Sequence, residues 1–123
     1  MVIQVCHDYA KLAGIEDCIK MDSMNQINHI REALLPIFNA NPVHSAILFG
    51  SYARGEATEQ SDIDIVIDSR GQLLNMSFYG ILDEITDRLG IRVDLFEISE
   101  IRKPSPMYNE ILQKGVRIYD RQG

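Results

Sequence analysis

Residues 43–68 read VHSAILFGSYARGEATEQSDIDIVID, and this stretch decides the fold. Its first part, 43–49, is an apolar run that stops abruptly at Gly50-Ser51. A short apolar run that ends at a glycine predicts a buried strand. The next ten residues, 52–61, are mostly polar, and we expect a loop there.

Two further segments predict strands that carry aspartates. Over 62–68 apolar and polar residues alternate, so the isoleucines should share one face of a strand while Asp62 and Asp64 share the other. Residues 91–96 form a third candidate strand, in which Asp94 faces away from its apolar neighbours. If the third strand neighbours the Asp62–Asp64 strand, the three carboxylates converge.

Helical signals flank these strands. Residues 23–26, SMNQ, form a capping box, and apolar residues at helical spacing follow it as far as Phe38. Pro36 is expected to kink or end this helix, because proline removes a backbone donor. A second apolar stripe predicts a helix over 72–89, which Gly90 ends.

The C-terminal part completes the expected fold. Ser-Pro at 105–106 opens a short helix, and a last strand covers 116–119. The order α-β-β-α-β-α-β predicts an α+β fold: a small mixed β-sheet with helices packed on it. The helix between the second and third strands should make them parallel, through a right-handed crossover. We expect residues 24–120 to form one domain and residues 1–23 to be an N-terminal extension of unknown role.

Composition narrows the range of functions. The chain has 123 residues, enough for one compact domain, and its formal net charge is −6. A negative surface repels phosphate backbones, so no direct nucleic-acid binding is expected. No apolar run approaches the roughly 20 residues of a membrane-spanning helix, and the start of the chain does not resemble a secretory signal. A cytoplasmic location is therefore expected, with Cys6 and Cys18 as free thiols.

The chemistry is expected where the glycine turn meets the aspartates. At Gly50 another group can approach the backbone closely, and Ser51 begins a turn whose N–H groups can bind phosphate oxygens. Asp62 and Asp64 repel each other unless a cation lies between them, and hard oxygen ligands favour Mg²⁺. If Asp94 joins them, the three carboxylates form a site for two-metal phosphoryl or nucleotidyl transfer.

Competing motifs fail at specific positions. Gly50 and Gly55 have the spacing of a P-loop, but Glu56-Ala57 stands where its lysine and hydroxyl residue belong. A calcium loop would need glycine at Ile67 and glutamate at Leu73. Cys6, His7 and Cys18 lack the paired spacing of zinc ligands.

The set of motifs resembles the polymerase-β-type nucleotidyltransferases, and within them the minimal nucleotidyltransferases found beside HEPN-domain toxins. The residues that carry the resemblance are Gly50-Ser51, Asp62-Ile63-Asp64 and Asp94. The resemblance implies the polymerase-β-like nucleotidyltransferase fold and a Gly-Ser turn that binds the triphosphate. It also implies that all three aspartates hold Mg²⁺, as two ions, and that the third helps to deprotonate the attacking hydroxyl. Arg54 matches a basic position common in this branch, where a phosphate contact and a solvated loop arginine are comparably plausible.

The same resemblance implies a function and leaves alternatives open. It implies an antitoxin that transfers AMP from ATP to a hydroxyl, a tyrosine, of a cognate HEPN toxin. About 100 residues serve the catalytic core, so the acceptor should arrive on another molecule. One alternative is a non-catalytic antitoxin that acts by occlusion. The other is nucleotidyl transfer to a small molecule such as an aminoglycoside, in a pocket completed by a homodimer.

Overall fold

The computed structural model describes residues 23–73 and 75–121. The expected N-terminal extension, up to residue 22, lies outside the described residues, as do Cys6, Cys18 and Leu74. None of the described helices is long and apolar enough to cross a membrane.

Four strands form one mixed sheet in the order β3-β2-β1-β4. β1 is Ser45–Phe49, β2 is Ile63–Asp68, β3 is Val93–Glu97 and β4 is Val116–Asp120. β1 runs antiparallel to both β2 and β4, whereas β2 and β3 are parallel. The mixed sheet and the parallel pair expected from the sequence are therefore confirmed.

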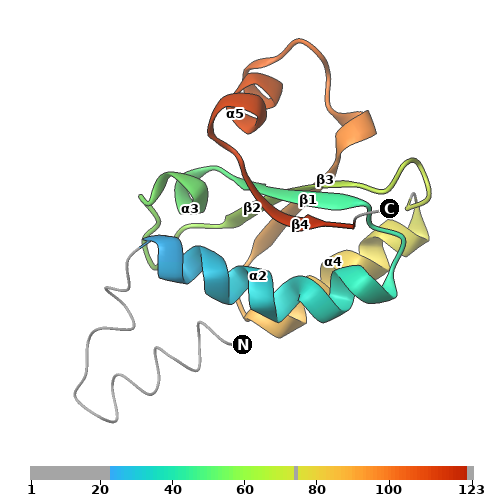
Figure 1. The fold of residues 1–123 in the computed structure, drawn as a ribbon, viewed down its shortest axis with the longest axis horizontal. Helices are drawn as coiled ribbons and strands as arrows, with labels where there is room; N and C mark the ends of the chain where they lie inside the picture. Colours follow the sequence, from blue (N-terminus) through green and yellow to red (C-terminus); the bar gives the residue numbers. More distant parts are fainter. Residues whose placement is uncertain (1–22, 74, 122–123) are drawn as a thin grey trace.

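Helices cover both faces of the sheet (Figure 1). α2, Ser23–Ala40, and α4, Met76–Leu89, lie side by side under one face, and α5, Pro106–Lys114, lies over the other. The Ser105 hydroxyl caps α5 by accepting a hydrogen bond from the Tyr108 backbone N–H, 3.1 Å away, as the Ser-Pro signal predicts. α3, Ser51–Arg54, and a 3₁₀ turn, Ile98–Glu100, complete the described elements.

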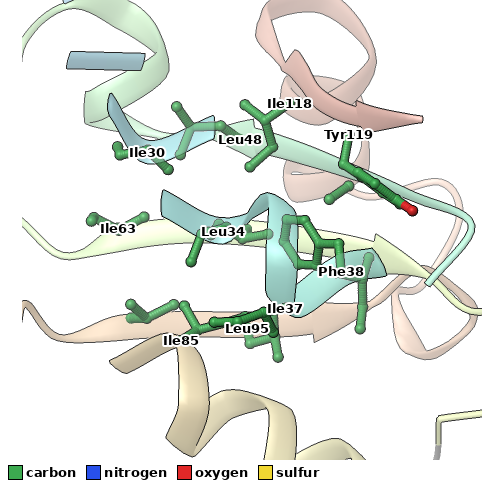
Figure 2. Close-up of a cluster of buried hydrophobic side chains, with 14 of the residues drawn as sticks. Ile30, Leu34, Ile37, Phe38, Leu48, Ile63, Ile85, Leu95, Ile118 and Tyr119 are labelled. Atoms are coloured by element: carbon green, nitrogen blue, oxygen red, sulfur yellow. The ribbon is translucent and has the colours of Figure 1, made fainter. Parts of the chain in front are cut away.

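The main core lies between the sheet and the α2–α4 layer. Figure 2 shows Ile30, Leu34 and Phe38 of α2 against the sheet. Ile63, Ile65 and Ile67 of β2 are fully buried toward this core, so the predicted alternation is correct. A second apolar cluster lies under α5, made by Phe49, Val66, Ile101 and Ile111. The aspartates of the site therefore share their sheet face with α5, opposite the main core.

Three local expectations are corrected. Of the kink or end expected at Pro36, the end does not occur, because α2 continues to Ala40. Pro36 has no backbone N–H to donate to the carbonyl four residues earlier. Because Pro36 is exposed, water can hydrogen-bond to that carbonyl instead. The expected loop over 52–61 begins with the short helix α3, in which Tyr52 is buried. α4 begins at Met76 instead of residue 72, since the backbone has positive φ at Arg70, Gly71 and Asn75.

A buried polar network near the end of β3 is absent from the sequence-based expectations. The Glu97 carboxylate is 3% exposed and accepts hydrogen bonds from the backbone N–H and hydroxyl groups of Ser69 and Ser99. Four donors satisfy this carboxylate and tie the loop after β2 to the turn after β3. The network is structural, and it lies on the core face of the sheet rather than with the aspartates.

Candidate active site

Asp64 and Asp94 are brought together by strand register. They are paired across the parallel strands β2 and β3, so their side chains leave the same face of the sheet. Asp62 lies one residue before β2, and its Oδ2 is 3.7 Å from the Arg92 Nε. The structure thus brings together the two aspartates that the sequence placed on different strands, with Asp62 beside them.

Gly50 packs directly against Asp64. Phe49 is the register partner of Asp64 across the antiparallel strands, and Gly50 follows with φ 77° and ψ −154°. A Cβ built at Gly50 would overlap the Asp64 Oδ2. Any other residue would therefore meet both backbone strain and a collision with the carboxylate. The close approach expected from the sequence is made by Asp64 itself.

The turn after Gly50 presents backbone donors beside this carboxylate. Ser51 begins α3 and is half-buried. The turn is closed by the Arg54 N–H to the Gly50 carbonyl at 3.1 Å, and by the Glu56 N–H to the Ser51 carbonyl at 2.9 Å. The first N–H groups of a helical turn have no acceptor within it, so those at Ser51 and Tyr52 are suited to bind phosphate oxygens.

Electrostatic repulsion is concentrated on Asp64. Burial raises the pKa of its carboxyl to about 6, and the nearby charges of Asp94, Asp62 and Glu110 add to the rise, as does a hydrogen bond with Asp94. Tyr52 lies under the site, and its pKa is raised by burial and by the charge of Asp62. A cation between the carboxylates would relieve this repulsion.

The donor set fits a hard divalent cation, but it is not preassembled. Paired carboxylates are the ligands that Mg²⁺ prefers. Within residues 23–73 and 75–121, no three His, Cys, Asp or Glu side chains are arranged to hold a metal ion. Asp62 instead contacts the largely exposed Arg92. Because exposed ion pairs are weak, turning Asp62 toward the other two aspartates costs little.

Arg54 is engaged by carboxylates. Its Nε lies 2.9 Å from the Glu56 Oε1 and its Nη1 lies 2.8 Å from the Glu110 Oε2. The hydrogen bond to Glu56, followed by the charges of both glutamates, raises the pKa of Arg54 above its usual value. Glu110 is a site residue that sequence reasoning missed. It comes from α5, and only the tertiary fold places it near Asp64, so no local motif could have identified it.

Two cavities on the described part of the chain lie away from these residues. One, of about 330 Å³, is bounded by α4, β3 and the turn after it, with Phe78, Tyr79 and Phe96 among its lining residues. The other, of about 470 Å³, lies between α2 and β4. None of their lining residues belongs to the predicted site.

Comparison with known proteins gives a family match over most of the chain. The family model described as "Polymerase beta, Nucleotidyltransferase" matches residues 32–123. Two relatives from Methanocaldococcus jannaschii are each named "Putative protein adenylyltransferase". One is 44% identical over 62 residues, which are 50% of this chain and 63% of the relative, so the match spans less than two thirds of that relative. The other is 34% identical over 83 residues, 67% of this chain and 96% of the relative.

Solved structures give the same fold. A "putative minimal nucleotidyltransferase" superposes with a TM-score of 0.61 at 26% identity, covering 78% of this chain and 95% of that one. A toxin–antitoxin crystallised with AMP-PNP superposes with a TM-score of 0.65 at 20% identity, covering 75% of this chain and 74% of that one. A tri-AMPylated Shewanella oneidensis HEPN toxin in complex with an MNT antitoxin gives a TM-score of 0.56 at 20% identity, covering 80% of this chain and 73% of the matched chain. The fold expected from the sequence is confirmed.

Proposed function

Because this chain belongs to the polymerase beta nucleotidyltransferase family, we propose that it is an antitoxin that transfers AMP from ATP to a tyrosine hydroxyl of a HEPN-domain toxin. Transfer to this partner would silence the toxin. The proposal takes its donor, acceptor and partner from proteins that this chain resembles: relatives named for protein adenylyltransferase activity, and a fold neighbour bound to an AMPylated HEPN toxin.

The observation that carries the proposal is the contact between the glycine turn and the aspartate pair. Gly50 lies against Asp64, and Asp64 is in register with Asp94. A nucleotidyl transfer needs a phosphate-binding group and a cluster of carboxylates within a few ångströms of each other. The pairing of β1 with β2 brings Gly50 beside Asp64, and the pairing of β2 with β3 brings Asp94 beside Asp64, which supports the proposal.

Each side chain has a defined task in this proposal. The backbone donors of the turn that begins at Gly50-Ser51 bind the triphosphate and hold the pyrophosphate as it leaves. Asp62, Asp64 and Asp94 would hold Mg²⁺, which when bound neutralises phosphate charge and makes the α-phosphorus more electrophilic. A carboxylate oxygen of Asp94 accepts the proton of the attacking hydroxyl. The new bond joins the hydroxyl oxygen to the α-phosphorus, and the bond between the α-phosphorus and the bridging oxygen breaks.

The proposal is tested by the origin of the transferred group. The purified chain is incubated with Mg²⁺, the proposed HEPN-domain partner, and ATP labelled either at the α- or at the γ-phosphate. Label from the α-position should become attached to the HEPN protein, and label from the γ-position should not. Asp64→Asn should abolish the labelling, and Asp68→Asn is its matched control on β2. Asp68 lies at the far end of the strand and accepts a hydrogen bond from the Arg70 backbone N–H.

The alternatives give different results in the same assay. If the wild-type chain neutralises the HEPN protein without attaching any label, occlusion replaces transfer. Transfer of γ-label would indicate a kinase and overturn the proposal. Transfer to an aminoglycoside, with an unlabelled HEPN protein, would assign a small-molecule acceptor.

A further inference from the structure

The guanidinium of Arg54 joins two elements that flank the aspartates. Its Nη1 contacts the Oε2 of Glu110 on α5 at 2.8 Å, while its Nε contacts Glu56, just past α3, at 2.9 Å. The side chains of Arg54 and Glu110 are 31% and 35% exposed, whereas that of Glu56 is 66% exposed. The contact with Glu110 is therefore the less solvated of the two, and it is the one that links α3 to α5.

Both partners of this contact lie at the border of the site. The backbone N–H of Arg54 bonds to the Gly50 carbonyl, which places Arg54 one helical turn from the glycine that contacts Asp64. Glu110 is close enough to Asp64 for its charge to help raise the pKa of that carboxyl. Arg54 thus lies beside the turn that begins at Gly50, and Glu110 lies near the aspartate pair.

A triphosphate in this position would have opposite effects on the two residues. Arginine binds phosphate through strong charge-assisted hydrogen bonds, so Arg54 would be drawn toward the ligand. Glu110 would be repelled by the same charge, at distances where screening by salt is incomplete. An exposed ion pair is weak enough for a bound triphosphate to break it.

We propose that Glu110 competes with the nucleotide triphosphate for Arg54, so that the Arg54–Glu110 contact opens when the nucleotide binds. This inference rests on the proposed function, since it requires that the Gly50 turn binds a nucleotide. It makes Glu110 a positioning residue that acts through Arg54 and holds α5 against α3 until the ligand arrives. Glu110 has no proton-transfer task in this scheme.

The test is the affinity for MgATP, measured by calorimetry without any acceptor protein. Glu110→Gln keeps the shape of the side chain and removes its charge, and we expect it to bind MgATP about two- to fivefold more tightly than wild type. Glu84→Gln, on the exposed side of α4, removes one negative charge under the opposite face of the sheet and should leave the affinity unchanged. Thermal unfolding of each variant verifies that it is folded.

A double-mutant cycle shows whether Glu110 acts through Arg54. Arg54→Gln alone should weaken MgATP binding, and adding Glu110→Gln to it should give less than the gain seen in wild type. Weaker or unchanged binding by Glu110→Gln, or an equal gain in Glu84→Gln, would overturn the inference while leaving the proposed function intact. A wild-type chain that does not bind MgATP would overturn both.

Discussion

Replacing Asp64 by asparagine should stabilise the metal-free fold and at the same time abolish AMP transfer. Asp64 lies against Gly50 and in register with Asp94, so its negative charge is half-buried and is repelled by the neighbouring carboxylates. Asparagine keeps the shape of the side chain and removes the charge. Opposite effects on stability and activity distinguish a strained functional carboxylate from a structural one.

The size of the effect follows from the pKa of Asp64. Its rise from 3.8 to about 6 is slightly more than two pH units. At about 1.4 kcal/mol per unit this corresponds to a ceiling of about 3 kcal/mol against the ionised folded state. The site is partly open to solvent, so we expect about 1 kcal/mol. For a domain of this size, that gain corresponds to a rise in melting temperature of roughly 4–8 °C.

The pH dependence of the gain identifies its cause. Below pH 3.8 Asp64 is protonated in both the folded and the unfolded chain, and its charge has no effect. Between pH 3.8 and about 6 the unfolded chain releases the proton while the folded chain keeps it, so the destabilisation grows as the pH rises. The difference in melting temperature between Asp64→Asn and wild type should therefore be largest near pH 7.5 and small near pH 4.

The assay is thermal unfolding in EDTA at both pH values, with transfer to the HEPN partner measured in parallel. Asp68→Asn is the control, because it removes a charge from the same strand without touching the pair. An Asp64→Asn variant that is less stable than wild type at pH 7.5, or equally stable, would refute the electrostatic reasoning. A variant that keeps full transfer activity would remove Asp64 from the site.

Three further outcomes follow from other contacts. The affinity for Mg²⁺ should fall about tenfold per pH unit below pH 6, because the ion must displace the proton on Asp64. A Mg²⁺ affinity that does not change between pH 5 and pH 8 would contradict this. Gly50→Ala should lose MgATP binding and about 1–3 kcal/mol of stability, because Gly50 has a positive φ and contacts Asp64. Calorimetry measures the first loss and urea unfolding the second. MgATP binding as tight as in wild type would count against the phosphate-binding turn. Glu97→Gln should lower the free energy of unfolding by about 2 kcal/mol, because it disturbs the hydrogen bonds from Ser69 and Ser99. The activity of the folded protein should be unchanged. A loss of activity without a loss of stability would assign Glu97 to the site.

The pair of strands at 43–68 could be predicted because one physical pattern governs it. Alternation puts Ile63, Ile65 and Ile67 into the core, and the same period turns Asp64 to the other face. A helix between β2 and β3 predicts that these strands are parallel. That they are also neighbours, which pairs Asp94 with Asp64, is shown only by the structure.

Features that depend on side chains distant in sequence could not be predicted. Glu110 forms an ion pair with Arg54 and raises the pKa of Asp64 through its charge only because α5 packs over the sheet. The Glu97 network likewise depends on the loop after β2 lying against the turn after β3. That α2 continues past Pro36 could not be predicted, because sequence alone does not show that Pro36 faces solvent, where the missing backbone donor is tolerated.

The central claim is tested most directly by the intact mass of the proposed HEPN-domain partner of this chain. That protein is co-expressed with wild type and with the double variant Asp62→Asn/Asp64→Asn, and its mass is measured after purification. We expect one or more added AMP units with wild type and none with the double variant. An unmodified HEPN protein in both cases, or the same modification in both, would contradict the assignment of AMP transfer to these aspartates.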